Sequence, residues 1–348
     1  MPIDEREEPG ASARPAASMS FPPLGPFDSG SVSIRLYPHN DLSADLIVSE
    51  ICSQAGLALD NGFDGVMTSE HHGGFAGYMA QPLQMASFIL EENPSGWAAA
   101  APLLLPLRPT ALVAEEVAWL QARHRGRVGL GVAVGALPLD FEAAGINRDD
   151  AVDSFKMELP RLVAMLRGDE LGDLEGDPAL LACRAAPVPV LSAAVSVAAA
   201  VRAAGCGAGI LMEGMSAPDR LVRLTRAFEE AGGTGSKVLI RRVWLGRVDS
   251  ALVESQRAVY ESYAAGSFGA DQTVASDEPG EMAERLAAIM REVGADALNL
   301  RVQLPGMSPE QVREQIVQIG STVVAPLKKF LSSDGRTARR SADRSPPA

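Results

Sequence analysis

Gly62-Phe-Asp-Gly-Val-Met-Thr-Ser-Glu-His-His72 joins a helical pattern to a strand and places three polar residues at the strand's end. Gly62 can end the helix in a left-handed conformation that glycine adopts at little cost. Residues 63–69 form a short, mostly apolar segment typical of a buried strand. Active sites of α/β barrels and sheets lie at such strand ends, so Glu70, His71 and His72 are candidates for chemistry. The alternative is that one histidine caps the strand and the other is solvated.

Eight strand-like segments alternate with helical patterns along the chain. The predicted strands cover residues 31–37, 63–69, 97–105, 127–134, 188–193, 208–213, 237–245 and 295–302. The predicted helices cover residues 43–61, 82–92, 109–124, 151–166, 196–204, 218–231, 250–264, 281–293 and 308–330. Strands that are each followed by a helix predict a TIM-like (β/α)8 barrel. A doubly wound open sheet is the second possibility, but the strand-turn-helix phosphate loop typical of it is missing.

The barrel is expected to occupy residues 31–331. Residues 1–30 are acidic and then rich in Pro, Ala and Ser, and residues 332–348 combine Arg with Ser, Pro and Ala. Both compositions predict disordered segments, an N-terminal arm and a C-terminal tail. Two irregular stretches, 171–187 and 266–279, are predicted as insertions after strands four and seven.

Composition narrows the class of protein. The chain has 348 residues, 47% of them hydrophobic, and a net charge of −13. The negative charge argues against binding to nucleic acid or to an anionic membrane, and no apolar run is long enough for a transmembrane helix. Cys52, Cys183 and Cys206 are scattered, which favours reduced thiols and a cytoplasmic location. The N-terminus lacks the pattern of a secretory signal.

The fourth strand, 127–134, has one face made only of small residues. Because strand side chains alternate, this face holds Gly129, Gly131, Ala133 and Gly135. The neighbouring third strand is similarly bare over its alanines at 98–101. Barrel interiors are normally filled by bulky side chains, so two bare strands predict a flat slot for a planar ring. The alternative is that bulky residues from elsewhere in the chain fill the space.

A metal site is the obvious rival for the Glu-His-His motif. Neighbouring strand residues point to opposite faces, so His71 and His72 cannot easily bind one ion. His39 and His124 stand alone and complete no ligand set with a recognisable spacing. Nucleophilic catalysis is not favoured either, because the sequence has no GxSxG and no Cys near a His. We therefore expect no metal.

Further motifs accompany Gly62–His72. They are Leu-Pro-Leu-Arg-Pro at 105–109, Ala-Glu-Glu at 114–116, Arg-Gly-Arg-Val-Gly-Leu-Gly-Val at 125–132, Asp140-Phe141 before Gly145, Asn-Leu-Arg-Val-Gln-Leu-Pro-Gly at 299–306 and Val-Ala-Pro-Leu at 324–327. Together they resemble the bacterial luciferase-like family of flavin-dependent monooxygenases. The resemblance covers residues 31–331 and is most specific in the first half.

The resemblance implies a TIM-like barrel that uses reduced FMN and O2 on a small organic substrate. It also implies a separate flavin reductase as a partner, with a homodimer expected. The catalytic histidine of the family matches His71, which would act as an acid/base or hydrogen-bonding group, with Glu70 orienting it. A cis peptide in the family's third strand matches Ala101–Pro102, where Pro102 also predicts a bulge because it lacks an N–H. Ala101, Pro102, Gly131 and Ala133 are thus the candidate contacts of the flavin ring.

The segment that would bind the cofactor phosphate departs from the family pattern. At the start of the helix after strand five, only Ser192 and Ser196 remain as hydroxyl donors, although a helix N-terminus still favours an anion. An arginine found near the end of the fourth strand in luciferases is Val134 here. This leaves two alternatives open. One is an oxidoreductase that uses the deazaflavin F420, and the other is a non-catalytic barrel that partners a catalytic homologue.

Overall fold

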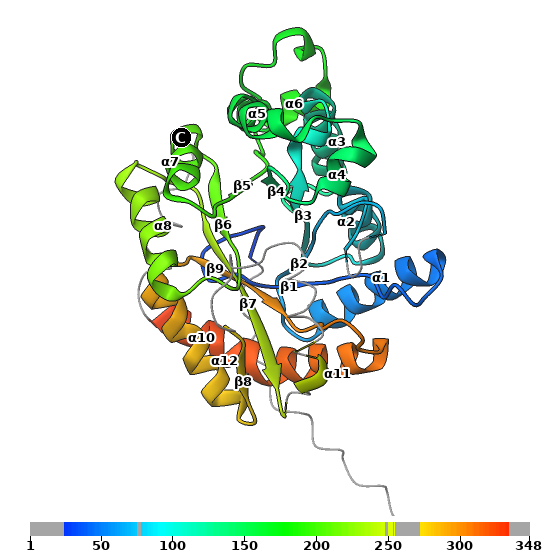
Figure 1. Cartoon of the computed structure of the whole chain (residues 1–348), viewed down its shortest axis with the longest axis vertical. Coiled ribbons are helices and arrows are strands. Elements are labelled where there is room, and N and C mark those ends of the chain that lie inside the picture. The colour runs from blue at the N-terminus through cyan, green and yellow to red at the C-terminus, as the bar shows by residue number, and fades with distance from the viewer. Residues whose placement is uncertain (1–23, 75–77, 248–249, 253, 255–271, 334–348) are drawn as a thin grey trace, which may run out of the picture.

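The computed structural model describes residues 24–74, 78–247, 250–252, 254 and 272–333. Parallel strands form a closed barrel within these residues, with β6 paired to both β5 and β7 (Figure 1). The eight barrel strands are β1 (Val32–Arg35), β2 (Gly65–Thr68), β3 (Trp97–Leu104), β4 (Val128–Ala133), β5 (Val190–Ala193), β6 (Gly209–Met212), β7 (Lys237–Leu245) and β9 (Ala297–Arg301). The predicted (β/α)8 barrel is confirmed.

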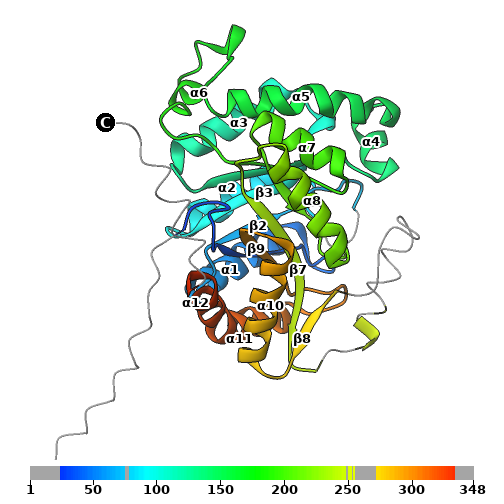
Figure 2. The ribbon, with the colours of Figure 1, turned by 90° about the vertical axis from the view of Figure 1, so that its left-hand side faces the viewer.

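Helices surround the barrel, and the two orthogonal views show them outside the strands (Figures 1 and 2). The longer ones are α1 (Ala44–Asp60), α2 (Pro82–Glu92), α3 (Thr110–Arg123), α5 (Ala151–Met165), α7 (Val197–Cys206), α8 (Pro218–Glu230), α10 (Pro279–Val293), α11 (Pro309–Ile319) and α12 (Ala325–Ser333). Their ends follow ordinary signals: Pro stands in the first turn of α2, α8, α10 and α11. Gly62 follows α1 with a φ of +99°, as the sequence predicts. No described helix is long and apolar enough to cross a membrane.

Two apolar layers hold the fold together. The outer layer lies between the strands and the helices and contains the large face of β4, namely Val128, Leu130 and Val132. The inner layer lies inside the barrel and includes Phe27, Met67 and Trp97. Alternation along each strand assigns its residues to one layer or the other. The predicted division of the two faces of β4 is therefore confirmed.

The N-terminal part of the barrel interior is filled, which corrects the expected slot in that region. The rings of Phe27 and Trp97 meet edge to face with centroids 5.3 Å apart. A Cβ at Gly65 would lie 2.1 Å from the Trp97 ring, and one at Gly129 would lie 2.7 Å from the Phe27 ring. These glycines make room for bulky residues from elsewhere in the chain, the alternative considered for the bare strands.

The expected arm and tail need correction at their inner ends. Residues 24–30 pack against the barrel, with Phe27 buried and the N–H of Gly30 bonded to Asp296 O at 2.8 Å. At the other end, α12 extends to Ser333. The remainder of both segments, 1–23 and 334–348, lies outside the described residues.

Four further features depart from the predicted elements. The stretch 171–187 contains a 3-10 turn, Gly172–Leu174, and the helix α6 (Pro178–Ala182), whose first N–H groups are capped by Asp177. A short helix, α4 (Pro138–Ala144), follows β4. Part of the second expected insertion is a strand, β8 (Val274–Ser276), which pairs with the end of β7. A π-helical turn, Gly320–Val324, interrupts the last predicted helix.

The predicted helix 250–264 lies almost entirely outside the described residues.

Candidate active site

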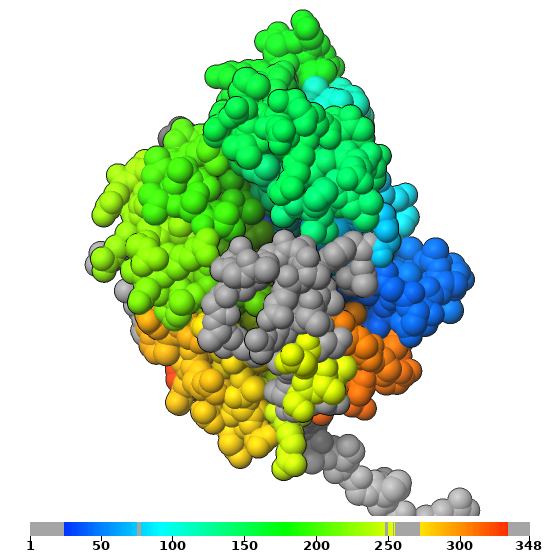
Figure 3. Space-filling view, viewed as in Figure 1, coloured from blue at the N-terminus to red at the C-terminus, as the bar shows by residue number. Residues whose placement is uncertain are grey.

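A pocket with a cavity volume of about 370 Å³ opens at the C-terminal ends of the barrel strands. In the space-filling view, segments coloured green, orange and blue lie around the central part of this face (Figure 3). One side of the pocket consists of Pro102, Leu104, Ala133 and Ala193, from β3 to β5. The pocket therefore has one wall of small and apolar side chains, as expected for a planar ligand.

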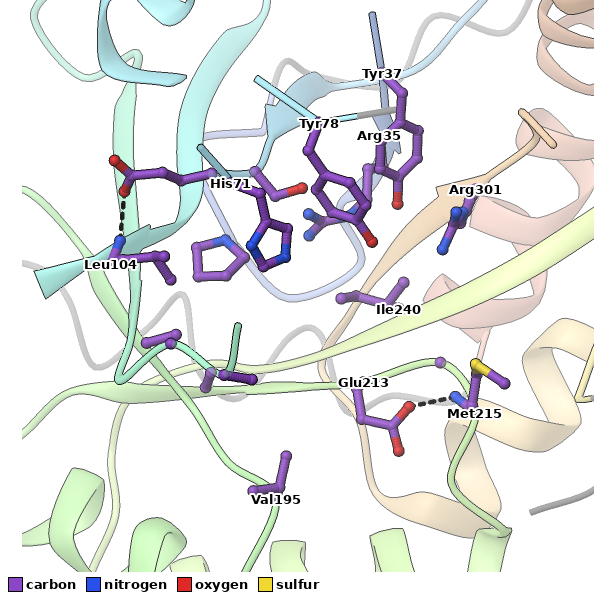
Figure 4. Close-up of a pocket in the computed structure, with 18 of the residues that line it drawn as sticks. Arg35, Tyr37, His71, Tyr78, Leu104, Val195, Glu213, Met215, Ile240 and Arg301 are labelled. Atoms are coloured by element: carbon purple, nitrogen blue, oxygen red, sulfur yellow. Dashed lines mark hydrogen bonds between the residues drawn. The ribbon is translucent and has the colours of Figure 1, made fainter. Parts of the chain in front are cut away.

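His71 points into this pocket between Leu104 and Tyr78 (Figure 4). Its Nδ1 lies 2.8 Å from Oδ2 of Asp140, a fully buried residue of α4. The other carboxylate oxygen of Asp140 accepts the backbone N–H of His72 at 2.7 Å. Because a carboxylate oxygen accepts hydrogen bonds, His71 donates through Nδ1, and the neutral form of the ring then carries its lone pair on Nε2. The ring of Tyr78 meets the His71 ring edge to face, with the two ring centroids 4.5 Å apart.

Glu70 has a different role from the expected one. Its Oε2 accepts the backbone N–H of Leu104 at 2.5 Å, and its Oε1 contacts Arg108 and lies 2.9 Å from Nε2 of His72. Burial raises the pKa of the Glu70 carboxyl, whereas Arg108, the Leu104 N–H and His72 oppose that rise. Glu70 thus ties the end of β2 to the end of β3. The prediction that Glu70 orients His71 is wrong, because Asp140 makes that contact.

The structure brings only some of the predicted cofactor residues to the pocket. Pro102 and Ala133 line it, and the Ala101–Pro102 peptide is cis, as predicted. Ala101 lies inside the barrel, where a Cβ on Gly131 would come within 2.8 Å of the Ala101 Cβ. Gly131 therefore permits the close approach of β3 and β4 and does not line the pocket. The two strands also shift register between Ala100 and Leu103, which agrees with the predicted bulge.

The two predicted phosphate donors lie outside the pocket lining. The Ser192 hydroxyl is fully buried, with no hydrogen-bond partner within the described residues. The Ser196 hydroxyl caps α7 by accepting the Ala199 N–H at 3.3 Å. Val195, between them, does line the pocket. These positions do not support direct contacts from either hydroxyl to a ligand in the cavity.

Sequence reasoning missed several residues of the site. Asp140 appeared only as part of a motif, and its helix α4 was not predicted. The arginines Arg35, Arg242 and Arg301 line the pocket, and only Arg301 lies in a quoted motif, the one at 299–306. Their positions could have been found from strand alternation, since Arg35 and Arg301 share the inward faces of Ser33 and Asn299. The described residues contain no group of three or more His, Cys, Asp or Glu side chains placed to hold a metal ion.

Comparison with known proteins identifies the family of this chain. The sequence matches the family described as luciferase-like monooxygenase over residues 36–325. The chain belongs to the luciferase-like monooxygenase family. An uncharacterized protein of Mycobacterium tuberculosis is 33% identical to this luciferase-like chain over 148 residues. That match covers 38% of this chain and 48% of the relative, so the chain spans about half the length of that relative.

Solved structures show the same barrel as this luciferase-like chain. The monooxygenase RslO1 from Streptomyces bottropensis has a TM-score of 0.70 at 17% identity, covering 84% of this chain and 98% of that one. The oxygenating constituent of 3,6-diketocamphane monooxygenase from Pseudomonas putida was solved with FMN. Its TM-score is 0.65 at 17% sequence identity, and the match covers 85% of this chain and 98% of that one. An F420-dependent secondary alcohol dehydrogenase was solved with an F420-acetone adduct. Its TM-score is 0.64 at 15% sequence identity, and the match covers 86% of this chain and 99% of that one. At these identities the likeness concerns the fold.

Proposed function

We propose that this protein is a flavin-dependent monooxygenase that uses reduced FMN and O2 on a small organic substrate. One observation carries the proposal: the ring of His71, held by the buried Asp140, points into a pocket that has a wall of apolar side chains. Membership of the luciferase-like family supports it. The structural neighbour that was solved with FMN supports the choice of cofactor.

The wall formed by Pro102, Leu104 and Ala133 suits the flat ring of a flavin, because none of these side chains carries a polar atom. A bound reduced flavin supplies the two electrons needed to activate O2. The chain itself supplies His71, whose Nε2 lone pair can take or return a proton at the reacting centre. Asp140 keeps that ring in one orientation and one tautomer. A flavin reductase as the source of reduced flavin is part of the same proposal.

F420 is the second candidate cofactor. A structural neighbour contains an F420-acetone adduct, and the same apolar wall suits a deazaflavin ring. In that case His71 would serve proton transfer next to a hydride transfer between cofactor and substrate. The two candidates differ in their need for O2, and direct binding separates them.

Anaerobic titration of the full-length protein with reduced FMN and, separately, with reduced F420 tests the proposal. We expect saturable binding of reduced FMN, tighter than that of oxidised FMN, measured by flavin fluorescence. Ala133→Leu should weaken this binding at least about tenfold by filling the apolar wall, while Ala182→Leu, on the exposed surface of α6, should not. Binding of F420 alone would favour the second candidate. Binding of neither would contradict both and favour a non-catalytic barrel.

A further inference from the structure

Ser69 is a buried serine that stands directly after β2, two residues before His71. Its side chain is only 3% exposed and lines the cavity. Met67, two residues earlier, belongs to the apolar layer inside the barrel, so alternation along the strand places the Ser69 side chain on the same inner face. Ser69 therefore lies where that apolar layer ends and the pocket begins.

Backbone hydrogen bonds fix the strand end that carries Ser69. The Ser69 carbonyl accepts the Met79 N–H at 3.1 Å, and the next residue, Glu70, donates its N–H to the Pro102 carbonyl at 3.0 Å. These bonds tie the segment to β3 on one side and to the chain before α2 on the other. The serine side chain therefore starts from a fixed backbone and has a defined direction into the pocket.

The Ser69 hydroxyl has no hydrogen-bond partner within the described residues. A buried hydroxyl that has lost water and gained no partner is costly, so such groups call for an explanation. Ser192 has an equally buried hydroxyl without a partner in the same part of the chain, but it does not line the pocket. Of these two hydroxyls, only that of Ser69 can be reached by a ligand in the cavity.

Aromatic rings line the side of the cavity next to Ser69. Tyr37, which comes shortly after β1, meets Tyr78 edge to face with ring centroids 5.3 Å apart, and Tyr78 in turn meets the His71 ring. Figure 4 shows these three rings along one side of the cavity, with Ile240 close to them. Because β1 and β2 are neighbours in the sheet, Ser69 belongs to this same side. The side suits a ligand with an apolar or aromatic body.

The chemistry of a hydroxyl indicates which ligand atom would meet Ser69. A serine O–H can donate one hydrogen bond and its oxygen can accept others. Unpartnered buried donors are rarer in folded proteins than acceptors with a spare lone pair, so the O–H group has the greater need of a partner. The adjacent carboxylate of Glu70 does not supply one, because it accepts the Leu104 N–H and contacts Arg108. The expected partner is therefore an acceptor oxygen of a ligand.

We propose that Ser69 determines substrate specificity by donating a hydrogen bond from its hydroxyl to an acceptor oxygen of the substrate. The apolar body of the substrate lies against Tyr37, Tyr78 and Ile240. The bond holds the polar end of the substrate beside the strand end that also carries His71. The substrate class is then a small, mainly apolar compound with an acceptor oxygen such as a carbonyl. This inference rests on the proposed function for the reaction, but the binding of such a compound does not need the cofactor.

Pairs of compounds that differ only in the acceptor oxygen test the proposal on the full-length protein. The pairs are acetophenone with α-methylstyrene and cyclohexanone with methylenecyclohexane, in which a methylene group replaces the carbonyl oxygen. Broadening of the ligand NMR signals gives the dissociation constants. We expect the ratio of ketone affinity to alkene affinity to fall about fivefold in Ser69→Ala for at least one pair, the usual size of one neutral hydrogen bond. Ser69→Thr, which keeps the hydroxyl, should retain most of the ratio.

Ser192→Ala is the matched control, because it removes a hydroxyl that is also buried and unpartnered but lies outside the pocket lining. It should leave the ratio unchanged. Melting temperatures separate a ligand-binding role from a structural one. Since the Ser69 hydroxyl bonds to none of the described residues, ligand-free Ser69→Ala should melt at the wild-type temperature or above it. A clearly lower melting temperature would assign the hydroxyl to the stability of the fold and overturn the inference.

Three other results would also overturn it. An unchanged affinity ratio in Ser69→Ala for both pairs would show that water, and not a ligand, satisfies the hydroxyl. Failure of all four compounds to bind the wild type would exclude this substrate class. Weaker binding of reduced FMN in Ser69→Ala, with an unchanged ratio, would assign the hydroxyl to the cofactor. Absence of reduced FMN binding in the wild type has a different meaning, because it contradicts the proposed function and leaves the contact between Ser69 and the ketones intact.

Discussion

His71 and His72 are neighbours in the chain, but they contact different acids. His71 meets Asp140 and lines the pocket, whereas the His72 ring meets Glu70. The backbone N–H of His72 binds the same Asp140 carboxylate, so one buried acid fixes both the ring of His71 and the chain that follows it. We expect the chemistry to depend on the His71–Asp140 pair.

Substitution of His71 should show this dependence. His71→Ala is expected to lower turnover by about 10²–10⁴-fold, the usual contribution of a positioned acid or base, while binding of reduced FMN is retained. His72→Ala, the neighbouring control, should cost less because its ring binds Glu70. Turnover is measured with reduced FMN supplied by a reductase. A fully active His71→Ala variant would exclude the acid/base role.

Asp140 is a positioning residue, so the test of its role needs a measurement that a simple loss of packing would not change. In Asp140→Asn the amide can donate to Nδ1 of His71, which favours the tautomer with its proton on Nε2. We expect turnover to fall about 10²-fold and its pH profile to shift, with Asp140→Glu restoring part of both. An unchanged pH profile would show that Asp140 acts only through packing.

Buried thiols give a third prediction at the scale of single residues. Burial raises the pKa of Cys52 to about 12, with the Glu92 charge adding to the rise, and burial also raises the pKa of Cys183. At pH 8 only about one Cys52 in 10⁴ would be thiolate, the reactive form. Native protein should therefore leave both cysteines unlabelled by iodoacetamide, and urea should expose them together. Mass spectrometry reads the modified peptides. Rapid native labelling of Cys52 would contradict its burial.

At the scale of elements, one ion pair joins the last helix to the segment before β2. Nζ of Lys328, on α12, contacts Oδ1 of Asp64 at 2.7 Å and the carbonyl of Gly62 at 2.8 Å. Asp64 also accepts the Val32 N–H of β1 at 2.8 Å. The pair thus connects α12, β1 and the loop leading into β2, and both charged side chains are almost fully buried.

Lys328→Met should destabilise the fold by about 3–5 kcal/mol, because it leaves a buried carboxylate without its cation. Lys329→Met, on the exposed face of α12, is the control. Burial raises the pKa of Asp64 and Lys328 opposes that rise, so the variant's Asp64 should bind a proton more readily. The loss of stability in the variant is then present at neutral pH, and it shrinks as the pH falls through the raised pKa of Asp64. Urea unfolding at several pH values measures it, and a pH-independent deficit would contradict the charge effect.

At the scale of the whole molecule, residues 24–30 close the N-terminal end of the barrel. Phe27 belongs to the apolar layer inside the barrel, although its neighbours Trp97 and Gly129 lie far along the chain from it. It takes the room that Gly129 leaves, and it packs against Trp97. The segment before the first strand is therefore part of the barrel core.

Phe27→Ala should cost about 3–5 kcal/mol, the range for emptying an aromatic site in a core. Gly129→Ala should also be destabilising alone, because its new Cβ would lie 2.7 Å from the Phe27 ring. In the double variant the second substitution should cost much less, since the ring it meets is gone. Phe88→Ala, at a half-exposed ring on α2, is the control. Additive effects in the double variant would show that the two residues do not touch.

The barrel and the position of His71 could be predicted from local patterns. Alternation marked the strands and the two faces of β4, and Gly62 marked the end of α1, because such signals depend on neighbouring residues. The cis Ala101–Pro102 peptide was predicted from the resemblance to the family, whereas the bulge was also predicted from Pro102 itself. Elements shorter than two helical turns, such as α4, were missed because so few residues show no clear periodicity.

Contacts between distant segments were decided only by the tertiary structure. Asp140 lies 69 residues from its partner His71, and the arginines of β1, β7 and β9 meet only because the sheet closes. The same closure decided that Phe27 and Trp97, and not a ligand, fill the space above Gly129 and Gly65. The sequence by itself determined which backbone elements form and which faces they bury, because those choices are local. The partners across the barrel depended on strand register and on the shapes of side chains far apart in the chain, and only packing in three dimensions decides these.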